Sequence, residues 1–189
     1  MIKDWIVENP DASVFSSHTM SGPLPHIDGV RILPVMILRD PIARIKSAYK
    51  FERQQVSDSL GARLAKKHDL ENYVLARLKI ENDRQCRNFH MSVLASFTTG
   101  SSSELDRAKK SVTMLKSLGV IGFVENFEEF VENLASQILP IWPDFTWKNT
   151  RSNTSDKSPR LNEDPDLISL LEKVNADDIE LVNWARARL

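Results

Sequence analysis

Cysteine, glycine and long apolar runs are scarce in this sequence. Its 189 residues include one cysteine, Cys86, so no disulfide can form within the chain, and a lone thiol is typical of a reducing compartment. No apolar run approaches the roughly 20 residues needed to cross a bilayer. The polar, acidic segment 1–11 is not followed by the apolar core of a signal peptide. Together these absences predict a cytoplasmic protein without a membrane span.

An excess of charge of one sign is also lacking. The 25 Lys and Arg residues against 26 Asp and Glu give a formal net charge of −1, so there is no overall basic field for nucleic acid. Any anion site must therefore be local. We also find no cluster of residues with metal-ligand spacing. Hydrophobic residues at 41% and charged residues at 27% are ordinary for a globular protein, and the length predicts one domain over residues 1–189.

Two short aliphatic runs, Ile32–Leu38 and Val120–Val124, lack polar alternation. This pattern indicates strands buried on both faces of a parallel sheet. Helical periodicity follows each run, and a further short strand is expected at residues 12–17. The expected helices cover residues 2–8, 41–55, 70–80, 83–97, 104–118, 128–139, 166–174 and 177–188. Strands alternating with helices predict an α/β protein with a parallel sheet and many helices.

The segment most informative about chemistry is Val35–Tyr49, which is expected to form a strand, a tight turn and a helix. Arg39 would stand at the carboxyl end of the strand, where open α/β sheets bind their ligands. Asp40 and Pro41 are a good N-cap and first helical residue. Ser47 follows two helical turns later, so a guanidinium and a hydroxyl are predicted to hold one phosphate. The alternative is a simple capping turn with Arg39 in an ordinary salt bridge.

The pattern Arg-Asp-Pro-x-x-Arg-x-x-Ser-x-Tyr at residues 39–49 resembles the 3′-phosphate-binding motif of sulfotransferases. The resemblance implies that Arg39 and Ser47 hold the 3′-phosphate of 3′-phosphoadenylyl sulfate (PAPS) or of its product, adenosine 3′,5′-bisphosphate (PAP). It implies no such role for Arg44, which we expect on the helix surface or paired with a nearby acid. The implied fold is a partial, P-loop-like, three-layer domain. The implied reaction transfers a sulfuryl group to a hydroxyl or amine of a carbohydrate, lipid or small metabolite.

Other segments add to this resemblance. Residues 17–25 resemble a Gly-His-x-Pro-x-Gly-type segment, which makes His18 the candidate general base; the alternative is a histidine with a local hydrogen bond. The polar loop 149–160 stands where the family places a nucleotide-binding loop, so Arg151 and Lys157 would contact the nucleotide, or else be ordinary surface cations. Residues 81–87 resemble a helix start near the acceptor cleft, but a helix capped by Asn82 with a solvated charged face is the preferred interpretation.

One element of the family is missing from the sequence. The Lys-x-Gly/Ala-x-Thr/Ser-like loop that holds the 5′-phosphosulfate is not found, since none of the six glycines has that setting and Lys3 is the only lysine before Arg39. We expect a domain shortened at its N-terminus by about 30 residues, the size of one strand, loop and helix, with impaired transfer. A non-catalytic remnant that binds PAP or a protein partner is the second hypothesis. A relative of P-loop nucleotide kinases is a third, and the absent loop weighs against it.

Overall fold

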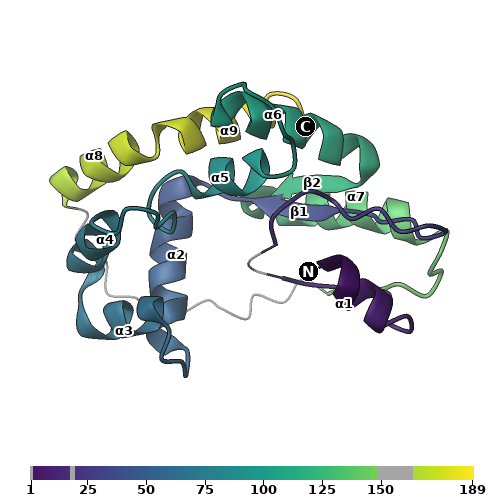
Figure 1. The fold of residues 1–189 in the computed structure, drawn as a ribbon, viewed down its shortest axis with the longest axis horizontal. Helices are drawn as coiled ribbons and strands as arrows, with labels where there is room; N and C mark the ends of the chain where they lie inside the picture. The colour runs from purple at the N-terminus through teal and green to yellow at the C-terminus, as the bar shows by residue number, and fades with distance from the viewer. Residues whose placement is uncertain (1, 18–19, 149–163) are drawn as a thin grey trace.

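The computed structural model describes residues 2–17, 20–148 and 164–189 (Figure 1). The described part is rich in helix around a small sheet of two strands, β1 (Val35–Leu38) and β2 (Val120–Phe123). The helices are α1 (Ile2–Glu8), α2 (Pro41–Gln54), α3 (Leu60–Lys67), α4 (Leu70–Leu78), α5 (Phe89–Ala95), α6 (Glu104–Leu118), α7 (Phe127–Ile138), α8 (Pro165–Val174) and α9 (Ala176–Arg186), with a 3-10 turn, η1, at Val124–Asn126.

The two strands are parallel, with Val35 paired to Val120 and Leu38 paired to Phe123. The predicted parallel pairing is therefore confirmed. Leu38, Ile121 and Phe123 pack with residues of α5, α6 and α9 in one hydrophobic cluster, which we call the sheet core. The opposite face of β2 is covered by α7, since a Cβ placed on Gly122 would lie 2.5 Å from the ring of Phe130.

Burial of β1 on both faces was predicted, and this is wrong for the face that it shares with Gly122. Val35 and Ile37 are 47% and 36% exposed, and among the described residues β1 pairs only with β2. Alternate residues of a strand point to one face. The exposed pair therefore marks the part of this face that α7 leaves uncovered.

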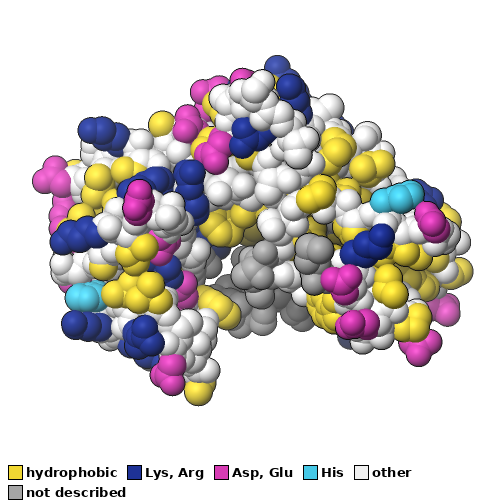
Figure 2. Space-filling model, in the orientation of Figure 1, with side chains coloured by type: hydrophobic (Ala, Val, Ile, Leu, Met, Phe, Trp, Pro, Cys, Tyr) yellow, Lys and Arg dark blue, Asp and Glu magenta, His cyan; other side chains and the backbone are white. Residues whose placement is uncertain are grey.

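A second hydrophobic cluster, which we call the α2 core, lies at the left of Figure 1 among α2, α3, α4 and α8. Its buried members include Ile45, Tyr49, Tyr73, Cys86 and Leu171. Helices α8 and α9 follow one another along the top of the view and connect the α2 core to the sheet core. On the face in Figure 2 basic and acidic side chains are interspersed, as expected for a net charge near zero.

Three expectations about elements are wrong. Residues 12–17 form no strand, the helix expected at 83–97 is confined to α5, and α3 was not foreseen. Helix α3 begins at a local cap, because the Ser59 hydroxyl accepts the Ala62 N–H at 3.3 Å; the early Gly61 hides its periodicity. The expectation of no membrane span agrees with the described residues, among which no helix is long and apolar enough to cross a bilayer.

Candidate phosphate-binding site at the end of strand β1

The turn between β1 and α2 has the predicted form. Arg39 directly follows the buried Leu38, and one oxygen of the Asp40 carboxylate, Oδ1, accepts the Ala43 N–H at 2.8 Å, with Pro41 as the first helical residue. Arg39 is half-buried, and the described residues offer its guanidinium no hydrogen bond and no ion pair. The ordinary salt bridge considered as an alternative for Arg39 is therefore not formed with any described residue.

The acid beside this turn is Glu125, at the carboxyl end of β2. Its Oε1 accepts the Asp40 N–H at 3.0 Å, while its Oε2 pairs with Arg186 at 2.7 Å. Burial opposes ionisation of Glu125, yet backbone hydrogen bonds from Asp40 and from its own N–H, with the Arg186 charge, hold its pKa below the usual range. The negative charge of Glu125 is thus balanced by Arg186, and the guanidinium of Arg39 remains able to bind an anion.

Ser47 lies on α2, about 10 Å along the helix axis from Asp40 at a rise of 1.5 Å per residue. It stands two residues from both Ile45 and Tyr49, so it faces away from the α2 core that those two residues enter. Ser47 is half-buried, and no described residue supplies its hydroxyl with a hydrogen-bond partner. Its hydroxyl is therefore available to a ligand, like the guanidinium of Arg39.

The three other predicted site residues, His18, Arg151 and Lys157, lie outside the described residues. Their roles as general base and nucleotide contacts stay predictions. Among the described residues no group of three or more His, Cys, Asp or Glu side chains gathers in a way that could hold a metal ion.

Arg44, expected on the helix surface or paired with a nearby acid, is drawn into the interior instead. Its guanidinium lies 4.1 Å from the centre of the Phe89 ring and donates to the carbonyl of Gln85. Its Nε is buried and has no hydrogen-bond partner. Burial lowers the pKa of Arg44, while the charge of Asp178 acts in the opposite sense. The surface placement is wrong, and Arg44 forms no ion pair with an acid among the described residues, although the charge of Asp178 acts on it.

Sequence reasoning missed His90, which belongs to the surroundings of Arg39. It is 8% exposed, and its Nε2 lies 3.1 Å from the carbonyl oxygen of Arg39. Burial, assisted by the charge of Arg44, lowers the pKa of His90 to about 4, so the ring is neutral at pH 7. A carbonyl can only accept, so Nε2 carries the proton and donates it to Arg39. A lone histidine on a short helix gives no sequence signal of this contact.

Helices α5 and α9 are connected at their starts by hydrogen bonds in which each segment caps the other. We call this arrangement the exchanged caps. The Asp178 carboxylate accepts the N–H groups of His90 at 2.9 Å and Met91 at 2.7 Å, and so caps α5. In return, the Asn88 side chain accepts the Asp178 N–H at 3.1 Å, and Asn175 Oδ1 accepts the Asn88 N–H at 2.9 Å. Asn175 and Asp178 are fully buried. This arrangement fixes the start of α5, and with it His90.

The segment 81–87 has neither the helix capped by Asn82 nor the solvated face that we expected. Its Asp83 pairs with Arg77 at 2.5 Å, and Arg77 also binds both oxygens of Glu52 at 2.7 and 2.8 Å. Glu52 also accepts the Tyr73 hydroxyl at 2.7 Å and the Gln85 side-chain N–H at 3.3 Å. We call this set of five side chains the Glu52 network. It joins α2, α4 and the loop before α5 at low exposure, and it holds Asp83, an acid of the segment that was expected to be solvated.

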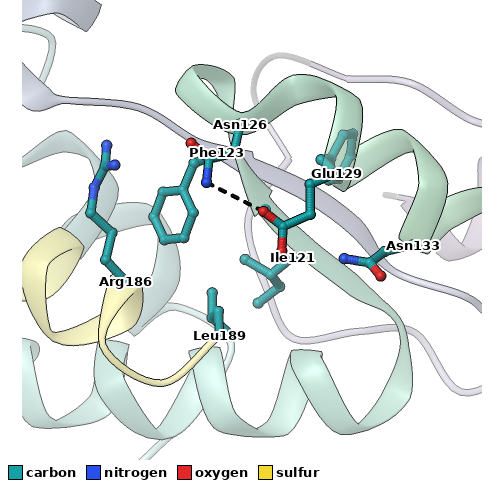
Figure 3. Close-up of a pocket in the computed structure, with 9 residues that line it drawn as sticks. Ile121, Phe123, Asn126, Glu129, Asn133, Arg186 and Leu189 are labelled. Carbon is teal, nitrogen blue, oxygen red and sulfur yellow. Dashed lines mark hydrogen bonds between the residues drawn. The ribbon is translucent and has the colours of Figure 1, made fainter.

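A cavity of about 200 Å³ lies between β2, α7 and the end of α9 (Figure 3). In it Asn126 donates to Glu129 at 3.3 Å, while Arg186 approaches from α9 and is already paired with Glu125. Arg186 thus stands between this cavity and the Glu125 contact to the β1–α2 turn. The cavity lining is Ile121, Gly122, Phe123, Asn126, Glu129, Phe130, Asn133, Arg186 and Leu189.

Comparison with known proteins gives little that bears on function. The chain is 35% identical over 154 residues to an uncharacterized protein of Archaeoglobus fulgidus, a match that covers 79% of this chain and 60% of that protein. The chain thus spans about 60% of the length of this curated relative. No family model matches the sequence, and no solved structure matches it.

Proposed function

We propose that the β1–α2 turn binds the 3′-phosphate of PAPS or PAP, with the Arg39 guanidinium and the Ser47 hydroxyl as its donors. The observation that carries this proposal is an arginine at the carboxyl end of a parallel strand that has no ion pair with any described residue. The nearest acid, Glu125, is already committed to Arg186 and to the Asp40 N–H. A guanidinium and a phosphate form charge-assisted, two-pronged hydrogen bonds, which suit this position.

The full activity that we propose is sulfuryl transfer by a domain of the P-loop-like sulfotransferase type. The acceptor oxygen or nitrogen attacks sulfur, the bond from sulfur to the 5′-phosphate oxygen of PAPS breaks, and PAP leaves. The acceptor proton passes to His18, and Arg151 and Lys157 add contacts to the nucleotide. Such a transfer needs donors around the phosphosulfate, and the sequence lacks the loop that supplies them. We therefore expect this polypeptide to bind PAP well and to turn over slowly or not at all.

Calorimetry with PAP and with adenosine 5′-monophosphate tests the binding proposal. PAP should bind more tightly, because only PAP carries a 3′-phosphate. Arg39→Ala should weaken PAP binding by about 10-fold to 100-fold, the range expected when a hydrogen-bonded charge is removed, and Ser47→Ala should weaken it less. Arg84→Ala removes an arginine of a partly exposed pair with Glu104 and serves as the control. Equal affinity for the two nucleotides, or an Arg39 variant that binds PAP like the parent, would contradict the proposal.

The second candidate function is a non-catalytic module that holds PAP, for which the motif at residues 39–49 would suffice. A transfer assay with labelled PAPS over a panel of hydroxyl and amine acceptors separates the two candidates. Turnover at ordinary enzyme rates supports a transferase, while PAP binding without turnover supports the module.

A further inference from the structure

The peptide group between Arg39 and Asp40 is held on both of its polar sides. Its carbonyl oxygen, which belongs to Arg39, receives the Nε2–H of His90 at 3.1 Å. Its N–H, which belongs to Asp40, is donated to Oε1 of Glu125 at 3.0 Å. The two partners come from separate elements, α5 and the η1 turn after β2.

This peptide would otherwise be poorly satisfied. Strand β1 ends one residue earlier, and a helical partner for the Arg39 carbonyl would be the N–H of residue 43, which is already given to the Asp40 side chain. Backbone polar groups at such junctions need partners from elsewhere in the fold. His90 and Glu125 supply both.

We propose that His90 and Glu125 are positioning residues that clamp the Arg39–Asp40 peptide and thereby direct the Arg39 guanidinium toward the phosphate. This inference rests on the phosphate site proposed above. A fixed peptide plane restricts the backbone rotation that would swing the side chain away, so less conformational freedom is lost when the anion binds. Neither residue needs to touch the ligand.

The clamp is itself anchored in the fold. Asp178 accepts the backbone N–H of His90, and the His90 ring lies edge-on to Phe89 with ring centres 5.9 Å apart. On the other side, Glu125 is paired with Arg186, whose guanidinium lies 4.7 Å from the centre of the Phe123 ring. Both halves of the clamp thus transmit the rigidity of the sheet core to Arg39.

A double-mutant cycle with PAP as the probe tests this clamp. His90→Met keeps a side chain of similar bulk but removes the N–H donor, whereas His90→Gln retains a donor. We expect His90→Met to weaken PAP binding about 5-fold in the parent and not at all in an Arg39→Ala background, with His90→Gln recovering most of the loss. Binding of adenosine 5′-monophosphate should be unchanged. Glu125→Met opens the other side of the clamp and should show the same pattern, which keeps the test decisive if His90→Met does not fold.

Leu115→Ala is the control for general destabilisation, because Leu115 is buried in the same sheet core and its backbone carbonyl accepts the Gly119 N–H instead of the N–H of this peptide. It should lower the free energy of unfolding and leave PAP affinity unchanged at temperatures where it is folded. If His90→Met or Glu125→Met weakens binding equally with and without Arg39, the clamp is wrong. If Arg39→Ala weakens binding and neither clamp variant does, the clamp is wrong and the phosphate site stands. If the parent protein does not bind PAP, both proposals are overturned.

Discussion

At the scale of single residues, His90 gives the stability of this protein a distinct pH dependence. Its pKa in the folded chain is about 4, below the ordinary value of 6.5, so the native state excludes a proton that the unfolded chain accepts. Stability is therefore full above about pH 6.5 and falls as the pH drops toward 4. The charged and polar groups that bear on the ring are Arg44, the Arg39 carbonyl, Glu125 and Asp40.

We expect the free energy of unfolding to fall by up to about 3 kcal/mol between pH 7 and pH 4 from His90 alone, at 1.36 kcal/mol per pKa unit. Urea unfolding at several pH values measures this slope. His90→Gln should reduce the dependence of the free energy of unfolding on pH. His26→Gln is the matched control, since the side chain of His26 is 94% exposed, and it should keep the slope of the parent. An unchanged slope in the His90 variant would show that other groups set the acid sensitivity.

At the scale of elements, the exchanged caps between α5 and α9 should matter more than ordinary helix caps. Asp178→Ala removes the acceptor of two N–H groups, those of His90 and Met91, inside the fold. Each buried donor left without a partner costs about 1–3 kcal/mol, so we expect a loss of roughly 2–6 kcal/mol in the free energy of unfolding. Chemical denaturation measures it. The neighbouring Asp177→Ala loses one partly buried hydrogen bond from Asn88 and should cost about 1 kcal/mol or less; equal losses would contradict the exchanged-cap interpretation.

The Glu52 network joins α2, α4 and the loop before α5. The free energy of unfolding should be similarly sensitive to a substitution in this network. Glu52→Gln keeps the shape of the side chain but removes the charge that faces Arg77, leaving only Asp83 to balance it. We expect a loss of about 1–3 kcal/mol, because the amide replaces one acceptor oxygen by a donor and leaves a donor of Tyr73 or Arg77 without its partner. Glu104→Gln breaks the partly exposed pair with Arg84 and should cost less than about 1 kcal/mol. A comparison of the two urea midpoints decides whether burial sets the difference.

These elements also show what local sequence can and cannot predict. Helices α2 and α8 carry their start signals beside them, an Asp N-cap followed by Pro, and both were predicted within one residue of their observed ends. The turn at Arg39 was predictable for the same reason. Residues 83–88 are different. Asp83 pairs with Arg77 six positions earlier, outside the segment, whereas Asn88 donates to Asp177, 89 positions later, and adopts a left-handed backbone at φ 44°. No sequence pattern within residues 83–88 predicts those contacts.

The residues of the candidate site likewise fall into those that local sequence predicts and those that it does not. Arg39 and Ser47 belong to one contiguous motif, so a single sequence can place them on a strand end and the helix that follows. The clamp on the Arg39–Asp40 peptide comes from His90, 51 positions after Arg39, and from Glu125, 85 positions after Asp40. Its existence depends on how α5 and β2 pack against β1, which only the folded structure specifies.

At the scale of the whole molecule, the sheet core and the α2 core meet through one small set of polar residues. Asn175 donates to the Cys86 carbonyl at 3.0 Å and to the Leu171 carbonyl at 2.9 Å, both of which belong to residues of the α2 core. Its oxygen accepts the Asn88 N–H, next to α5 of the sheet core. Asn175 therefore links the two cores where the chain passes from Cys86 to α5 and from α8 to α9.

We expect this link to make the two cores unfold together, and Asn175→Ala to separate them. The chain carries its own probes, because Cys86 is its one cysteine and lies in the α2 core, while the four tryptophans, Trp5, Trp142, Trp147 and Trp184, lie outside that cluster. Burial raises the pKa of Cys86 to about 12, so its thiol reacts only when the α2 core opens. In the parent protein, tryptophan fluorescence and pulse labelling of Cys86 should give the same urea midpoint.

In Asn175→Ala the Cys86 midpoint should fall below the fluorescence midpoint, because the α2 core loses three hydrogen bonds to its neighbour and must then be stable by itself. Asn133→Ala, on the exposed face of α7, should leave the two midpoints together. If the Asn175 variant lowers both midpoints equally, cooperativity must come from α2 instead, since that helix also packs against α9 while it carries Ile45 and Tyr49 into the α2 core. The difference between the two urea midpoints thus measures how much the side-chain amide of Asn175 contributes to the cooperative unfolding of the two cores.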